Sequence, residues 1–136
     1  GIECKPISVE LTYGLERICM FVQGKKNVFD IDWNDNGVKY GEVYLQSEKE
    51  FSAYNFDQAN TDSLLKNFEI AEQECKNLLD QKLPLPAYDQ CLKASHIFNL
   101  LDARGVIAVA ERTGYINRIR ELAKGAGSGW LENQER

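Results

Sequence analysis

Four residues near the start of the chain have types and a spacing that suit a small charged ligand. Glu10, Thr12 and Gly14 stand at alternate positions, so on an extended strand they share one face. A carboxylate beside a hydroxyl forms an acceptor pair for a small ammonium group, and glycine lets a planar ligand approach the backbone closely. Arg17 offers a planar cation for stacking or for binding phosphate. An edge strand with polar residues facing water is the competing interpretation.

The local sequence predicts a strand, a tight turn and a helix that would position these residues. Residues 7–13 alternate apolar and polar side chains and are rich in β-branched ones, which is typical of a half-buried strand. Gly14 interrupts the alternation, and residues 15–23 predict a helix that ends at Gly24. Further along, we expect a turn at residues 34–37 and a helix over part of 42–54.

From residue 60 onward, apolar residues spaced three and four apart predict two helices that pack as an antiparallel hairpin. Asn60 or Thr61 is available as the first N-cap, and Pro86 can lie in the first turn of the second helix. The two inward stripes comprise Leu64, Phe68, Ala71, Cys75 and Leu78, then Ala87, Cys91, Ala94, Phe98 and Leu101.

A third helix should follow a stop at Gly105 and begin near Val106. The glycine-rich residues 125–129 should end it and leave residues 125–136 as a flexible tail. We expect the inward face of this helix to comprise Ile107, Ala110, Ile116, Ile119 and Ala123.

The composition of the chain argues against several classes of protein. Its 136 residues carry a formal net charge of −5, which disfavours general nucleic-acid binding. No apolar run approaches the roughly 20 residues that a membrane span needs, so we expect no membrane segment and a cytoplasmic protein. The four cysteines lie far apart and there is one histidine, so we predict reduced thiols and no metal site.

Several segments together resemble one family of enzymes. Residues 9–24 are similar to motif 3 of class II aminoacyl-tRNA synthetases, a strand–helix unit with a Gly-x-Glu-Arg type ending: VELTYGLERICMFVQG. Four further segments resemble, in order, the α subunit of the bacterial heterotetrameric glycyl-tRNA synthetase: ECKP, YNFDQA, LPLPAYDQCLKASHIFNLLDARG and AERTGYINRIRELAK. The resemblance runs from Gly1 to about Lys124, and the pairing of YGLER with FNLLDARG is its most specific feature.

The resemblance implies a mainly α chain with a remnant of the class II antiparallel sheet. Residues 1–24 would be the motif 3 strand and helix of the catalytic core, and residues 25–59 a connecting segment. Residues 60–124 would form the C-terminal helical domain, followed by the tail at 125–136.

The resemblance also implies a glycine–tRNA ligase, which activates glycine with ATP to glycyl-adenylate and charges tRNA(Gly). Gly14 and Arg17 match positions that bind ATP, with Arg17 as the catalytic residue against the adenine and the terminal phosphate. Glu10 matches the residue that holds the glycine ammonium group, with Thr12 beside it. Mg²⁺ would accompany the ATP phosphates, and we predict no metal bound by this chain.

The implied partners are a β subunit, which carries most tRNA recognition in this family, and a second α subunit. Arg112, Arg118 and Arg120 are candidate tRNA contacts. A solvated face of mixed charge is the favoured interpretation of these arginines.

Two departures from the family limit the implied activity. Motifs 1 and 2, with the arginine that binds the α-phosphate, have no counterpart in the sequence. The GAGSG stretch at residues 125–129 stands where the family usually continues as a helix. The chain also opens at Gly1 without Met. We therefore expect a fragment that is inactive alone. A non-catalytic helical module for subunit interaction is one alternative. A fragment of an alanyl-type synthetase is another alternative. Motif 3 of the alanyl type usually has a second glycine at the position of Thr12, so Thr12 favours the glycyl type.

Overall fold

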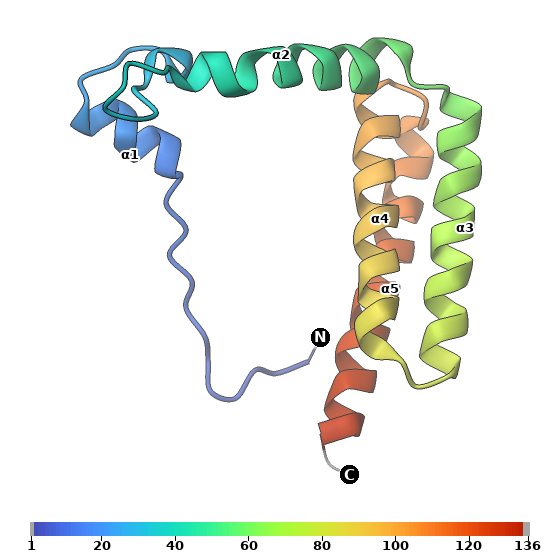
Figure 1. Cartoon of the computed structure of the whole chain (residues 1–136). Coiled ribbons are helices and arrows are strands. Elements are labelled where there is room, and N and C mark those ends of the chain that lie inside the picture. Colours follow the sequence, from blue (N-terminus) through green and yellow to red (C-terminus); the bar gives the residue numbers. More distant parts are fainter. Residues whose placement is uncertain (1, 135–136) are drawn as a thin grey trace. The chain divides into compact units, whose positions relative to one another are not determined.

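The computed structural model describes residues 2–134 and divides them into two compact units (Figure 1). The first unit comprises residues 4–55, and the second comprises the described residues from Phe56 onward together with residues 2 and 3. The helices of the first unit are α1 (Leu15–Val22), the 3₁₀ helix η1 (Val28–Asp30) and α2 (Tyr40–Ala53). A π-helical turn, η2, follows at Tyr54–Gln58. The second unit contains α3 (Thr61–Asp80), α4 (Pro84–Ala103) and α5 (Val109–Gln134).

The strand predicted at residues 7–13 is not formed. The segment is irregular, and residues 2–134 contain no strand beyond an isolated bridge between Asp32 and Lys39. A strand needs a neighbour for its backbone hydrogen bonds and a core to cover its apolar face. Within the described chain neither is available, because Ile7 and Val9 are 87% and 84% exposed.

The helix predicted after Gly14 and the turn predicted at residues 34–37 are both confirmed. Gly14 is the N-cap of α1, and the chain reverses after the helix at Gly24, whose φ is +63°. The side-chain oxygen of Asn34 accepts hydrogen bonds from the backbone of Asn36 and Val38, and Gly37 has a φ of +85°. The helix expected over part of 42–54 is α2.

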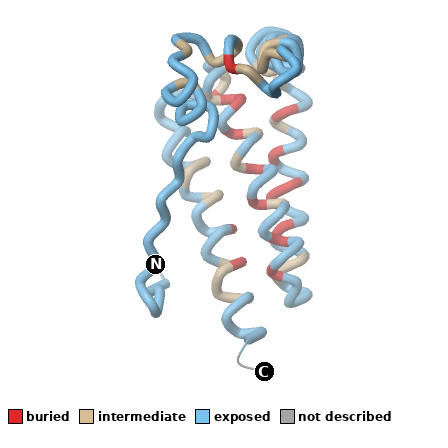
Figure 2. The backbone as a smooth tube through the Cα atoms, turned by 60° about the vertical axis from the view of Figure 1, so that its left-hand side comes forward, coloured by how far each residue is buried: buried red, intermediate tan, exposed pale blue. Residues whose placement is uncertain are grey.

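The second unit is a three-helix bundle whose core is the predicted α3–α4 hairpin. The Asn60 side chain caps α3 by accepting a hydrogen bond from the Ser63 amide, and Pro84 and Pro86 lie in the first turn of α4. Buried residues gather on the facing sides of these helices (Figure 2). Every predicted inward residue of the hairpin is buried except Leu78, which packs partly buried against the core.

Helix α5 differs from its prediction at its start and in its inward face. It begins at Val109 rather than near Val106, although the Gly105 stop is confirmed by a φ of +68°. Ile107 is buried before the helix begins, whereas Ala110 and Ala123 are exposed. The ring of Tyr115 lies against those of Phe68 and Phe98, which fixes the rotation of α5. This rotation turns Leu122 and Ala126 into the core in place of the predicted alanines.

The predicted flexible tail is wrong through Gln134, because α5 continues across the glycine-rich residues. Residues 135 and 136 lie outside the described part. Glycine lowers helix propensity by about 1 kcal/mol relative to alanine, but here it permits close packing. A Cβ built at Gly125 would lie 2.8 Å from the Leu79 Cδ1 atom, and one at Gly129 would lie 3.5 Å from Pro84.

Candidate functional site

The structure brings two of the predicted site residues into direct contact. The hydroxyl of Thr12 donates a hydrogen bond to the carboxylate of Glu10. Both side chains are exposed and belong to the irregular segment before α1. The two residues predicted to bind an ammonium group are therefore neighbours, although no strand positions them, and their binding role stays a prediction.

Gly14 leaves open space where α1 begins. Its φ and ψ are −70° and 117°, a conformation that any residue adopts. A Cβ built there would meet only the Arg17 Cβ atom, at 4.0 Å. The described fold therefore does not require glycine at this position.

Arg17 lies in the first turn of α1, where the helix dipole disfavours a cation. It is exposed, and in the part of the chain that the structure describes it makes no ion pair or hydrogen bond. The adjacent Glu16 accepts a hydrogen bond from the Tyr40 hydroxyl, at 3.4 Å. Burial and the nearby Glu16 carboxylate raise the pKa of Tyr40, which keeps this donor protonated.

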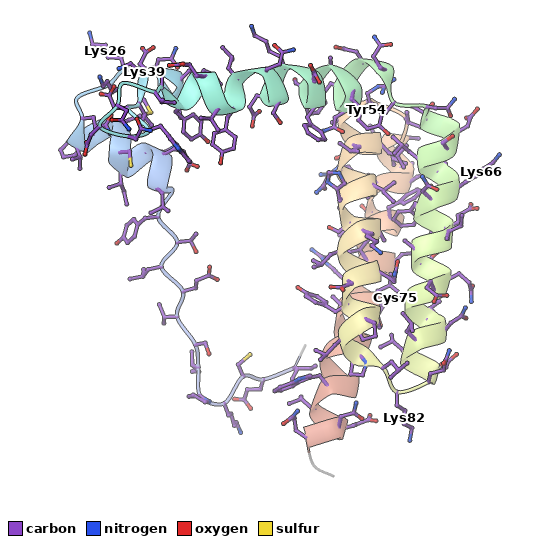
Figure 3. All side chains as sticks on the ribbon, in the orientation of Figure 1. Lys26, Lys39, Tyr54, Lys66, Cys75 and Lys82 are labelled. Atoms are coloured by element: carbon purple, nitrogen blue, oxygen red, sulfur yellow. The ribbon has the colours of Figure 1, made fainter. Side chains whose placement is uncertain are left out.

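Polar contacts after α1 form a cluster that sequence reasoning missed. The side-chain amide of Gln23 donates to the Asp32 carbonyl at 3.1 Å and accepts from the Asp32 amide at 2.8 Å. The Asp32 carboxylate pairs with Lys39, labelled in Figure 3, and with Lys25 at 3.0 Å. Hydrogen bonds from Lys39 and then Lys25 lower the pKa of Asp32. No short motif signals such a cluster, because its members meet only after the chain turns back at Gly24.

An apolar cavity of about 480 Å³ lies beside α1, but the predicted site residues do not line it. Its walls include Leu15 and Cys19 of α1 and an aromatic group, Trp33, Tyr40 and Tyr44. The rings of Tyr40 and Tyr44 have centroids 4.7 Å apart. Their spacing of four along α2 is the signal that would have placed them on one helix face.

The basic residues of α5 are mostly engaged within the bundle. Arg118 binds the carboxylate of Glu72, and Arg112 binds Asp102 at 3.1 Å. In the described range only Arg120 of the three candidate tRNA contacts lacks such a partner. The interpretation as a plain solvated face is therefore incomplete, because two of these arginines hold helices together.

Two of the four free thiols lie inside the bundle, as Figure 3 shows for Cys75. Burial raises the pKa of both Cys75 and Cys91. Among residues 2–134 no group of three or more histidine, cysteine, aspartate or glutamate side chains is arranged to hold a metal ion. No helix in this range is both long and apolar enough to cross a membrane.

The helix that begins at a glycine and carries a Glu-Arg pair in its first turn is the feature that resembles class II aminoacyl-tRNA synthetases. A comparison with protein families gives a more specific result. A family model described as "Glycyl-tRNA synthetase alpha subunit" matches residues 1–135. The chain therefore belongs to the glycyl-tRNA synthetase alpha subunit family, whose members are ligases of protein biosynthesis.

Membership of this family decides between the glycyl-type and the alanyl-type synthetase, which the sequence left open. It sets aside the alanyl-type synthetase, as the presence of Thr12 already suggested. The family as a whole implies a heterotetramer with a β subunit.

Proposed function

We propose that this chain supplies motif 3 to the active site of a glycine–tRNA ligase and that Arg17 contacts ATP there. The observation that carries the proposal is the state of Arg17. It is an unpaired, exposed cation in the described range, at a helix end that disfavours cations. A phosphate-bearing ligand at this end would offset both features.

The surroundings of the other site residues are compatible with the roles that the resemblance implies. The open space at Gly14 allows the flat face of a nucleotide to approach the backbone. The Glu10 carboxylate, oriented by the Thr12 hydroxyl, would bind the ammonium group of glycine. Because glycine has no side chain to grip, selectivity would come from this anchor and from steric exclusion of larger amino acids.

The chemistry needs little from these residues beyond positioning and neutralisation of charge. The glycine carboxylate attacks the α-phosphate of ATP and pyrophosphate leaves. Mg²⁺ would be held by the ATP phosphates, and Arg17 would neutralise negative charge at the terminal phosphate. No described cluster of side chains would hold the metal by itself.

We propose that the irregular residues 7–13 pair with a sheet in the natural polypeptide. Alternating and highly exposed apolar side chains are what an unpaired sheet strand presents. The sequence contains no counterpart of the motif 2 arginine, so these 136 residues alone should be inactive. The protein would act in the cytoplasm, in a heterotetramer of two α and two β subunits.

Recognition of tRNA would fall mainly to the β subunit, which suits the net charge of −5. Of the three arginines of α5 that are candidates for direct contact with tRNA, Arg120 is the one we retain, because Arg112 and Arg118 have partners within the bundle. An Arg120→Glu variant tests this contact. A weaker affinity for tRNA with a shallower salt dependence would support it, and an unchanged salt dependence would end it.

The second candidate function is a non-catalytic helical module that binds another subunit. It is favoured by the amount of exposed apolar surface on α1 and before it. Glycine-dependent ATP–pyrophosphate exchange distinguishes the two functions. The assay uses the natural full-length polypeptide with its β subunit, and an Arg17→Ala variant is measured beside it. Exchange that falls in this variant supports the ligase, whereas no exchange in the parent supports the interaction module.

A further inference from the structure

The helix that carries Arg17 is held to its unit by polar contacts at its two ends. None of the eight residues of α1 is fully buried and only Met20 is half-buried, so apolar packing alone does not fix its direction. At the first turn, the Tyr40 hydroxyl donates to Glu16 over 3.4 Å, which is long for a hydrogen bond. At the other end, the Gln23 side chain makes the two shorter bonds to the backbone of Asp32.

Two bonds made by one planar amide fix rotation as well as distance. The Gln23 Nε2 atom donates to the Asp32 carbonyl, and its Oε1 atom accepts from the Asp32 N–H. The anchor itself is well held. The neighbouring Ile31 is 4% exposed, and its carbonyl accepts from the Tyr40 amide at 2.8 Å. On the other side, the Trp33 amide donates to the Val38 carbonyl at 2.8 Å.

We infer that Gln23 is a positioning residue for Arg17: its amide clamp on Asp32 sets the direction of α1. The inference rests on the proposed role of Arg17 at ATP. The Arg17 side chain makes no ion pair or hydrogen bond in the described chain, so the helix decides where this side chain starts. Gln23 follows Arg17 by six positions, or about 9 Å of helix.

This distance makes a small error in direction matter. A tilt of about 6° at Gln23 displaces the Arg17 backbone by about 1 Å over that length of helix. A misplacement of about 1 Å in a positioning group can cost as much as a hundredfold in rate. Glu10 and Thr12 precede α1 in the chain and bond to each other, so the tilt should affect them less.

The test replaces Gln23 by methionine, which keeps the length of the side chain and removes both hydrogen bonds. Glycine-dependent ATP–pyrophosphate exchange is measured on the natural full-length polypeptide with its β subunit. We expect the KM for ATP to rise about tenfold, with a smaller change in the KM for glycine. Gln46→Met is the matched control, since the Gln46 side chain bonds only to Glu50 on its own helix. It should leave both KM values unchanged.

A double variant separates positioning from general damage. If Gln23 acts through Arg17, adding Gln23→Met to Arg17→Ala should change the KM for ATP no further. The inference is overturned if Gln23→Met raises the KM for ATP as much in the Arg17→Ala background as in the parent. It is also overturned if Gln23→Met alone leaves the KM for ATP unchanged. If Arg17→Ala itself has no effect, the proposed function fails instead.

A second variant keeps the test decisive if the methionine variant does not fold, as judged by circular dichroism. Gln23→Glu retains the acceptor for the Asp32 amide and loses the donor to its carbonyl. It should raise the KM for ATP to an intermediate value on the parent and leave it unchanged on Arg17→Ala. A parent-like KM in the Gln23→Glu variant contradicts the clamp.

Discussion

The guanidinium of Arg118 on α5 makes two hydrogen bonds to the carboxylate of Glu72 on α3, and it lies 4.6 Å from the centre of the Phe68 ring. The same guanidinium lies 4.9 Å from the centre of the Tyr115 ring. Glu72 is only 9% exposed and takes a third contact from Lys76, at 3.1 Å. This ion pair joins the third helix of the bundle to the hairpin formed by the other two.

Removing Arg118 should destabilise the bundle. An Arg118→Met variant leaves the carboxylate of Glu72 largely buried, and we expect the free energy of unfolding to fall by about 2 kcal/mol. This is below the usual cost of breaking a buried pair, because the Arg118 side chain is 37% exposed. Arg120→Met is the control and should change stability by no more than about 0.5 kcal/mol.

The two tryptophans make this measurement specific to one unit. Trp33 belongs to the first unit and Trp130 to the bundle. In a Trp33→Phe background, urea unfolding followed by the fluorescence of Trp130 reports on the bundle alone. Equal stability of the Arg118 and Arg120 variants would contradict a structural role for the ion pair.

The ion pair also predicts how stability depends on pH. Arg118 and then Lys76 lower the pKa of Glu72 below its usual 4.5 through hydrogen bonds to the charged carboxylate. A lowered pKa in the folded state means that the pair contributes fully above about pH 4.5 and is lost as the pH falls through the folded-state value. The stability difference between the parent and Glu72→Gln should therefore shrink between pH 6 and about pH 3. A difference that stays constant over this range would show that the Glu72 charge contributes nothing.

Two glycines of α5 should respond in opposite ways to larger side chains. A Cβ at Gly114 meets nothing within 4 Å, so Gly114→Ala should stabilise the bundle by about 0.5–1 kcal/mol through helix propensity. At Gly125 the side chain of Leu79 is too close for anything large, and Gly125→Leu should destabilise by about 1–3 kcal/mol. Urea unfolding of both variants in the Trp33→Phe background tests this. Stabilisation by Gly125→Leu would show that α5 does not pack closely there.

The features of the fold that depend on short spacings in the sequence were predictable. The N-cap at Asn60, the apolar stripes of α3 and α4 and the stop at Gly105 depend on short spacings, and all were predictable. The course of α5 through residues 125–129 was not, because the close neighbours of its glycines, Leu79, Ile2 and Pro84, are far away in sequence. Residues 7–13 have the alternating pattern of a strand, but they form none because they have no partner in the described chain.

The candidate site also has features that were predictable from the sequence and features that were not. The alternation of residues 10–14 predicted that Glu10 and Thr12 lie on one face of a strand, whereas their hydrogen bond forms in an irregular segment. The clamp of Gln23 on Asp32 needs the chain to turn back at Gly24, and no pattern of residue types indicates which side chain will then meet which backbone group. The roles assigned to these residues at ATP and glycine stay predictions.

Gly14→Ala should separate binding from folding. Its backbone angles suit alanine, but alanine is a poorer N-cap than glycine, so the free energy of unfolding should change by no more than about 1 kcal/mol. The added methyl group would occupy the space that we propose for the nucleotide, so the KM for ATP should rise about tenfold or more. Thermal unfolding and ATP–pyrophosphate exchange are measured on the same preparation. An unchanged KM would remove Gly14 from the ATP site, and a loss of folding would contradict the described turn.

The central claim is that Glu10 and Arg17 bind the two substrates of one reaction, and glycine-dependent ATP–pyrophosphate exchange tests it most directly. The natural full-length polypeptide with its β subunit is compared with Glu10→Gln, Arg17→Ala and a charge-matched control, Glu69→Gln, on the exposed face of α3. We expect strong exchange in the parent and the control. Glu10→Gln should mainly raise the KM for glycine and Arg17→Ala mainly that for ATP, each by about tenfold to a hundredfold. Exchange that persists with parent KM values in both variants would contradict the account.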